Sequence, residues 1–329
     1  MTVTAKDVAK LASVSPSTVS RVINNDKRIS KATRNRVFNC IKKLDYKVNN
    51  IARSLKINKT FTIGFVAPEI SEEFFMRVAK GAEDYLSKYG YSLIICNASD
   101  SAKIEADKIQ LLYEKQVDGV IAVPSENTGK GFEILRKNDI PIVFADRYVD
   151  NFKADTVLVD NVNGTYRAIE HMINKGAKRI GFIGGTSELS NAKERYKGYL
   201  RAMEDYNIPI DSDLLKFGDF HIQSGYDLTK VLLKSKNPPG YLFVSNYYMH
   251  VGAIQYLIEQ QKKKDLKIEM ASFDDMQLTA LLGFASITVA QPIIEIGRTA
   301  AKVLLDRISG ENTNADYTIT RLKPEFIYY

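Results

Sequence analysis

The sequence predicts an all-α helix-turn-helix headpiece followed by a two-lobed, doubly wound α/β core. Two observations on residue patterns indicate this fold class, and a third, on charge, distinguishes the headpiece from the core. Residues 4–24 carry the caps and the apolar spacing of two short helices separated by a sharp turn. From Phe61 onward, strand-like apolar runs alternate with amphipathic helical segments, which is typical of parallel sheets covered by helices. The net charge of +7 is divided unequally, because residues 1–60 hold 14 Lys and Arg against 3 Asp, giving +11 there and −4 in the remainder.

The first helix of the headpiece is expected to begin after Thr4. The Thr4 hydroxyl can cap this helix, and Asp7, three residues later, completes a capping-box pattern. Three residues at helical spacing are expected to form its apolar face: Val8, Leu11 and Ala12. Ser13 and Val14 then leave room only for a sharp corner before the next helix.

The second helix is expected to have Ser15 as its cap and Pro16 at its first position, where the missing N–H costs nothing. Its predicted inward residues are Val19, Val22 and Ile23. The residues that remain on or beside the exposed face are Ser17, Thr18, Ser20 and Arg21. Small polar side chains with an Arg suit the base edges of a DNA major groove and its flanking phosphates. Short helix pairs occur in many folds, so this geometry alone does not establish DNA binding.

A third helix, capped by Ser30, is expected to close the headpiece. Its apolar residues at helical spacing are Val37, Phe38, Ile41 and Leu44. The segment from Tyr46 to Lys59 lacks an apolar face large enough to fold alone. The predicted boundaries are therefore 1–46 for the headpiece, 47–60 for a hinge and 61–329 for the core.

Composition limits the classes of function. A basic N-terminal segment followed by a mildly acidic remainder is typical of a polyanion-binding module fused to a globular domain. A merely solvated basic surface would not explain why the positive charge is concentrated in one part of the chain. Cys40 and Cys96 are the only cysteines and are not expected to pair, and neither a signal peptide nor an apolar run of about 20 residues occurs. A cytoplasmic location without membrane contact is expected. The three His show no metal-ligand spacing and no nucleophile elbow or Walker motif occurs, so neither an enzyme, a metal nor a cofactor is expected.

The headpiece resembles that of the LacI/GalR family of bacterial transcription regulators. The segments that carry the resemblance are Asp7-Val8-Ala9, Val14-Ser15, Thr18 to Asn24, Thr33-Arg34, Leu44-Asp45-Tyr46 and Ala52-Arg53-Ser54-Leu55. The resemblance extends over essentially the whole chain. It implies a homodimeric, sequence-specific regulator that reads a pseudo-palindromic double-stranded DNA operator, with a periplasmic-binding-protein-like core.

The resemblance also implies roles for individual residues. Arg21 is expected to contact a guanine edge, and Pro16 and Ser17 are expected to tune half-site preference. The residues expected to hold phosphates are Thr4, Ser15, Thr18, Asn24 and Thr33. In the hinge, Leu55 matches a residue that wedges into the minor groove and Ala52 its neighbour, although an exposed Leu could also be a plain linker residue. The hinge departs from the family in having Val48 where Pro is frequent.

Ten strands are predicted in the core, in two series. The first comprises Thr62–Ala67, Ser92–Cys96, Gly119–Val123, Ile142–Ala145 and Val157–Val159, and the second comprises Arg179–Ile183, Leu214–Phe217, Tyr241–Val244, Glu269–Phe273 and Ile287–Ala290. Among the helices between them are Phe74–Lys88, Ile104–Lys115, Ala192–Tyr206 and Ile293–Ile308. We expect a first lobe of about 61–160 plus 291–318 and a second of about 161–290 plus 319–329. Such folds bind ligands at the carboxyl ends of strands, here between the lobes.

Aromatic, charged and amide residues follow these predicted strands. They are Phe74, Phe75, Asp146, Arg147, Arg195, Phe220, Asn246, Asp274 and Gln291. Aromatic faces stack on sugar rings, while charged and amide groups bind paired hydroxyls. A purely structural role is also open to each residue, since Phe74 or Phe75 suits a helix core and Asp274 suits a helix cap. Their convergence at strand ends favours an effector site.

The family resemblance places ligand contacts at these same nine positions and implies a small effector, a pentose or hexose rather than a purine. A departure is Tyr247, where relatives usually carry Asp, and it leaves the ligand's identity open. One alternative is a sugar-processing enzyme, for which no acid/base constellation is found. The closer alternative is a catabolite-control-type regulator that senses a phosphorylated carrier protein, for which Glu295, Arg298 and Lys302 give only partial similarity.

Overall fold

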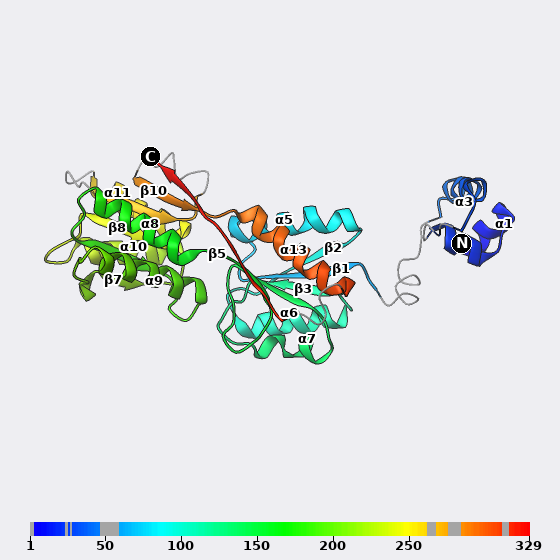
Figure 1. The fold of residues 1–329 in the computed structure, drawn as a ribbon, viewed down its shortest axis with the longest axis horizontal. Helices are drawn as coiled ribbons and strands as arrows, with labels where there is room; N and C mark the ends of the chain where they lie inside the picture. Colours follow the sequence, from blue (N-terminus) through cyan, green and yellow to red (C-terminus); the bar gives the residue numbers. More distant parts are fainter. Residues whose placement is uncertain are drawn as a thin grey trace. The chain divides into compact units, whose positions relative to one another are not determined.

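A computed structural model describes residues 3–23, 26, 28–46, 59–261, 268–275, 284–310 and 316–329. The chain forms two compact units, Met1–Thr60 and Phe61–Tyr329. The first contains the three helices of the headpiece and the second contains the α/β core (Figure 1).

The headpiece consists of α1 (Ala5–Ala12), α2 (Pro16–Ile23) and α3 (Lys31–Lys43). Their shared core is small and aliphatic: Val8, Ala9, Ala12, Val19, Val22 and Val37. Two residues expected in this core are exposed instead, Leu11 at 43% and Phe38 at 47%. Ala9 and Val37, which lie near them in the sequence, are buried in the core instead.

Turn and cap residues fix the helix ends as expected. Asp7 accepts hydrogen bonds from the backbone N–H and the hydroxyl of Thr4, at 2.8 and 2.7 Å. Ser13 adopts a left-handed φ of 52°, which produces the corner between α1 and α2. Ser15 and Ser30 accept backbone N–H groups three residues later, from Thr18 at 3.1 Å and Thr33 at 3.2 Å.

The first lobe of the core is a six-stranded parallel sheet in the order β11-β5-β4-β3-β1-β2. Its strands are β1 (Thr62–Ala67), β2 (Ser92–Asn97), β3 (Gly119–Ala122), β4 (Ile142–Ala145), β5 (Asp155–Val159) and β11 (Ile319–Leu322). Apolar clusters place α5 (Glu73–Leu86) and α13 (Ile293–Ser309) on one face, and α6 (Ala102–Glu114) and α7 (Glu133–Lys137) on the other. Short 3-10 turns occupy Ser87–Tyr89 and Lys130–Phe132.

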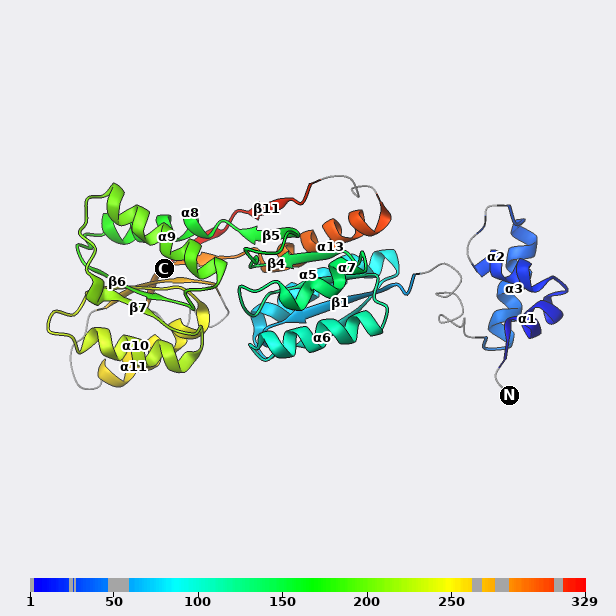
Figure 2. The same ribbon diagram turned by 90° about the horizontal axis from the view of Figure 1, so that it is seen from below.

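The second lobe is a six-stranded sheet in the order β12-β10-β9-β8-β6-β7. Its strands are β6 (Ile180–Gly184), β7 (Leu215–Phe217), β8 (Tyr241–Val244), β9 (Glu269–Phe273), β10 (Ala285–Ala290) and β12 (Glu325–Tyr328). The helices α8 (Asn161–Asn174) and α9 (Ser190–Asp205) cover one face, and α10 (Ile222–Leu233) and α11 (Tyr247–Gln261) the other, with a 3-10 turn at Ser212–Leu214. Figure 2 shows the two helix-covered sheets side by side. This confirms the predicted headpiece and two-lobed core.

The C-terminal strands differ from expectation. Ten strands were predicted, but β11 and β12 add a parallel edge to the first sheet and an antiparallel edge to the second. The chain therefore returns to the second lobe after Leu322, not at residue 319, and its red C-terminal segment crosses both lobes in Figure 1. The other two crossings follow β5 and β10, so three segments connect the lobes.

Candidate functional site

The exposed side of α2 carries the residues expected to meet DNA. Ser15, Pro16, Ser17 and Arg21 are exposed and Thr18 is half-buried. The Ser15 hydroxyl lies 2.7 Å from that of Ser17 and 2.9 Å from that of Thr18, so these three groups are ordered around the start of the helix. Arg21 extends from this surface in the last turn of α2.

The other residues expected to hold phosphates either take part in the hydrogen bonds of a helix cap or lie outside the described residues. The Thr4 hydroxyl donates to Asp7 and thereby lowers the pKa of that carboxyl group. The Thr33 hydroxyl accepts a 3.0 Å hydrogen bond from Ser30. Three of the predicted DNA contacts lie outside the described residues: Asn24, Ala52 and Leu55.

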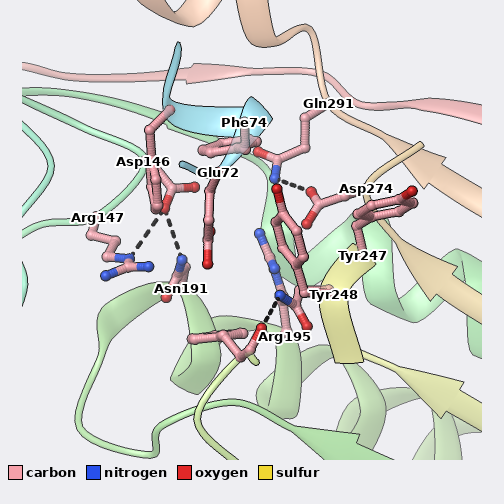
Figure 3. Close-up of a pocket in the computed structure, with 13 residues that line it drawn as sticks. Glu72, Phe74, Asp146, Arg147, Asn191, Arg195, Tyr247, Tyr248, Asp274 and Gln291 are labelled. Atoms are coloured by element: carbon pink, nitrogen blue, oxygen red, sulfur yellow. Dashed lines mark hydrogen bonds and ion pairs between the residues drawn. The ribbon is translucent and has the colours of Figure 1, made fainter. Parts of the chain in front are cut away.

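In the core, the structure brings all nine predicted effector residues together in one pocket between the lobes. The pocket is also lined by Glu72, Asn191, Tyr247 and Tyr248 (Figure 3). The residues come from both lobes, because parallel strands of the two sheets end toward the same cleft.

The first-lobe wall is built around Asp146 and Arg147, directly after β4. The Arg147 Nε lies 3.3 Å from Asp146 Oδ2, and an Arg147 terminal nitrogen donates to the Pro124 carbonyl at 3.2 Å. The guanidinium carbon lies 5.7 Å from the ring centres of both Phe75 and Phe220. The cation is therefore held between two aromatic rings from opposite lobes.

The second-lobe wall contains Arg195 and Asp274, which are both buried. Arg195 donates to Asn161 Oδ1 at 2.9 Å and to the Ser245 carbonyl at 2.6 Å, and it lies 3.9 Å over the Phe273 ring. Burial raises the pKa of Asp274, while Arg195 opposes that rise. Burial likewise lowers the pKa of Arg195, so each buried charge depends on the other for compensation.

Hydrogen bonds cross the cleft directly. Asn191 donates to Asp146 Oδ2 at 2.9 Å, and the Ser190 hydroxyl accepts the Tyr148 N–H at 2.9 Å. On the opposite side, the Tyr248 hydroxyl accepts the Glu73 N–H at 3.0 Å. The two walls are therefore held together from both sides of the pocket.

Two buried acceptors in the pocket have no hydrogen-bond donor among the described residues: Asp146 Oδ1 and Gln291 Oε1. The Gln291 amide N–H₂ donates to Asp274, which orients its oxygen away from that carboxylate. Buried acceptors are costly when unpaired, so this arrangement suits a ligand that supplies hydroxyl or N–H donors.

Asn246 has a structural role in addition to lining the pocket. Its amide nitrogen donates to the Phe220 carbonyl at 2.8 Å, and its oxygen accepts the Met249 N–H at 3.1 Å. Asn246 thus caps α11 and fixes the position of Phe220, although it also lines the pocket.

Sequence reasoning did not select Glu72, Asn191 or Tyr248, and it treated Tyr247 only as a departure from the family. Each lies at or near the start of a helix that follows a strand, which is the signal that could have identified them. The helix after Gly184-Gly185 begins at Ser190, so Arg195 lies further into the helix than expected, while Asn191 is at its beginning.

Three further features concern metal binding, membrane contact and the surface of α13. No group of three His, Cys, Asp or Glu there is arranged to hold a metal ion. None of the helices described is both long and apolar enough to cross a membrane. On α13, Arg298 forms a 2.7 Å ion pair with Glu295, and both side chains are exposed.

Comparisons with known proteins cover both units. Residues 4–49 match the model for bacterial regulatory proteins of the lacI family, and residues 60–327 match the model for periplasmic binding proteins and the sugar-binding domain of the LacI family. The HTH-type transcriptional repressor PurR of Aliivibrio salmonicida is 32% identical, with 98% of this chain and 97% of that protein covered. PurR of Haemophilus influenzae strain PittEE is also 32% identical, with the same two shares covered.

Solved structures show similar folds. A ribose operon repressor of Burkholderia thailandensis, described as putative, is 28% identical with a TM-score of 0.75, and 82% of this chain and 99% of that one are covered. A complex of the transcriptional regulator CelR with cellobiose is 26% identical with a TM-score of 0.75, and the shares covered are 99% and 98%. The Lac repressor dimer bound to operator has a TM-score of 0.86 at 21% identity, with shares of 99% and 98%, which shows the fold alone.

Proposed function

The chain belongs to the LacI family of DNA-binding bacterial repressors, which are not enzymes, and we propose that a pentose or hexose in the cleft controls its operator binding. Carbohydrate-metabolism genes are then the expected targets. The proposal places two headpieces of a homodimer on the halves of a pseudo-palindromic operator in the cytoplasm.

The chemistry of the pocket carries the choice of a sugar. The unpaired acceptors Asp146 Oδ1 and Gln291 Oε1 require donors, while the guanidinium of Arg147 presents N–H groups from the same wall. A hydroxyl group both donates and accepts, so a polyhydroxylated ring satisfies both kinds of group. The rings of Phe74, Phe75 and Phe220 offer faces for the C–H surface of such a ring. The ribose operon repressor and the cellobiose complex give this choice further support.

A purine base is the second candidate effector, because the PurR repressors are 32% identical over nearly the whole chain. A base could stack on the same aromatic rings and donate through ring N–H groups. A sugar remains the better match, since the pocket carries two arginines and two unpaired acceptors in addition to its aromatic residues.

Exposed apolar side chains support the proposed homodimer. In the first lobe, Ile94 and Ile95 lie on the edge strand β2 and are 36% and 46% exposed. In the second lobe, Phe217 on the edge strand β7 and Val231 on α10 are 43% and 53% exposed. Exposed apolar side chains on both lobes suit an interface that extends along the core.

Replacement of Asp274 tests the proposed site. The operator is first identified by selection from random DNA, and band-shift titrations then measure binding with and without a panel of sugars and purine bases. Asp274→Ala should retain operator binding without ligand but require at least about tenfold more ligand to respond, because a buried charged acceptor is lost.

Asp275→Ala is the matched control, because the neighbouring carboxylate accepts from Tyr329 and does not line the pocket. It should respond to the ligand as the unmodified protein does. A normal response by Asp274→Ala would place the sensing site elsewhere, and a response to a purine base alone would replace the sugar by the second candidate.

A further inference from the structure

One carboxylate in the pocket is not used by the contacts described above. Glu72 immediately precedes α5, its side chain is 15% exposed, and it points into the pocket in Figure 3. Within the described residues, no donor makes a hydrogen bond to this carboxylate. The nearest basic side chain is His221 of the second lobe, whose Nδ1 lies 3.9 Å from the carboxylate and whose side chain is 49% exposed.

The other charged residues of the pocket form two pairs, and in each pair an arginine compensates the charge of an aspartate. Arg147 lies beside Asp146 in the first lobe, and Arg195 compensates Asp274 in the second. The pocket therefore contains three carboxylates and two guanidinium groups, and Glu72 is the carboxylate in excess. Its negative charge has no cation committed to it inside the pocket.

We propose that Glu72 is a specificity-determining residue that makes the pocket bind uncharged sugars and reject their phosphorylated or carboxylated counterparts. The carboxylate accepts a hydrogen bond from a sugar hydroxyl but repels an anionic group brought into the same space. The repulsion is strengthened because the Glu72 side chain is largely buried, with 15% of it exposed. This inference rests on the proposed function, since it concerns the same pocket, and it adds the charge class of the ligand.

The surroundings of Glu72 add a pH dependence to this selectivity. Burial and the nearby Asp100 raise the pKa of Glu72 to about 7, while Arg147 acts to lower it. The charged and titratable groups that face it come from several elements: Glu69, Asp100, Arg147, His221, Tyr248 and Asp274. Because Glu72 is ionised above pH of about 7, rejection of anions should be strongest there and should weaken as the pH falls through that value.

Calorimetric titration of the full-length protein with matched ligand pairs tests the proposal. The pairs are glucose with glucuronate, galactose with galacturonate, and ribose with ribose 5-phosphate. At a pH of about 8.5, the uncharged member of the pair that binds should bind at least about tenfold more tightly than the charged member. For a hexuronate pair this ratio should decrease at a pH of about 6, where the sugar carboxylate stays ionised but Glu72 takes up a proton.

Three variants separate selectivity from folding. Glu72→Gln keeps the size of the side chain but removes its charge, so the ratio should fall by about tenfold and lose its pH dependence. Glu72→Asp retains the charge and should retain a ratio above one. Glu83→Gln should leave the ratio unchanged, because Glu83 is exposed on α5, does not line the pocket and is not among the groups that face Glu72.

The possible failures are distinguishable. Equal affinity for both members of a pair, or a ratio unaltered in Glu72→Gln, would overturn the role of Glu72 while leaving a sugar-responsive pocket. Binding of none of the uncharged sugars would overturn the proposed function and this inference together.

Discussion

Three residues of the pocket hold left-handed backbone conformations that non-glycine residues rarely adopt. Asp146, Phe220 and Asp274 have φ values of 64°, 72° and 71°. Such conformations cost on the order of 1–3 kcal/mol each, and they persist where surrounding structure enforces them. Asp146 and Asp274 are held by N–H bonds to the neighbouring strands, at 2.9 Å from the Val157 and Val289 carbonyls. The strain therefore falls on residues that turn their side chains into the cleft.

In the headpiece, a single residue should carry much of the base specificity. Arg21→Ala should weaken specific operator binding by roughly 1–3 kcal/mol and relax the preference at one base pair per half-site. The reason is that Arg21 is exposed on α2, beside the ordered hydroxyls of Ser15 and Ser17. Competition binding against operator variants measures the change.

Arg36→Ala is a suitable comparison, because it removes an equal charge from an exposed position on α3. It should weaken binding to operator and random DNA by similar factors. If Arg21→Ala also gives equal losses on both DNAs, Arg21 contacts only phosphate.

At the scale of elements, polar contacts of the buried Glu194 join α9 to two of the lobe crossings. Glu194 accepts from Asn161 at 3.1 Å, just after β5, and forms a bidentate pair with Arg321 of β11 at 2.6 and 3.0 Å. Asn161 in turn accepts from Arg195, whose guanidinium lines the pocket. Arg195 is therefore positioned by the same contacts that tie the second lobe to strands of the first.

Loss of Glu194 should consequently affect the ligand site although Glu194 does not line it. In Glu194→Ala, Asn161 and Arg321 lose their shared acceptor, so we expect the effector affinity to fall by roughly tenfold. Calorimetry on the full-length protein measures this change, with circular dichroism to verify folding. Glu204→Ala, an exposed position on the same helix, should bind the effector normally, and equal affinities in the two variants would exclude a positioning role.

The elements differ in how well the sequence predicts them. The buried strands β1, β4, β8 and β9 have the expected boundaries, because continuous apolar runs identify strands that are covered on both faces. The strands β11 and β12 were not predicted, because they are short edge strands with mostly exposed or half-buried residues. Their pairing depends on distant partners that a local pattern does not contain.

The sequence also predicts some residues of the pocket better than others. Residues directly after strands, such as Asp146 and Gln291, were selected because parallel strands end at a common edge. Glu72, Asn191 and Tyr248 were not, because the first turn of a helix presents several side chains in different directions. Which of them faces the cleft depends on how the opposite lobe is placed.

At the scale of the whole molecule, the positive charge lies in one compact unit and the effector pocket lies in the other. Residues 1–60 carry +11 and form one compact unit, while the more acidic remainder contains the pocket. Repression that responds to an effector requires that ligand binding in the core alters operator affinity, and this coupling is a property of the intact chain.

This division predicts that salt changes the affinity for the operator much more than the affinity for the effector. Lys and Arg that neutralise phosphates release counterions, so operator affinity of the full-length protein should fall linearly on a log–log plot against salt, by roughly 10³-fold or more between about 50 and 200 mM. Effector affinity should change little over the same range, because an uncharged sugar displaces no counterions.

A protein of residues 61–329 should bind the effector with the affinity of the full chain but show no operator binding, since it retains the pocket without the basic headpiece. Fluorescence anisotropy on labelled operator and calorimetry with the effector measure the two affinities. Operator binding by the shortened protein, or a flat salt response in the full-length one, would contradict the assignment of DNA binding to the headpiece.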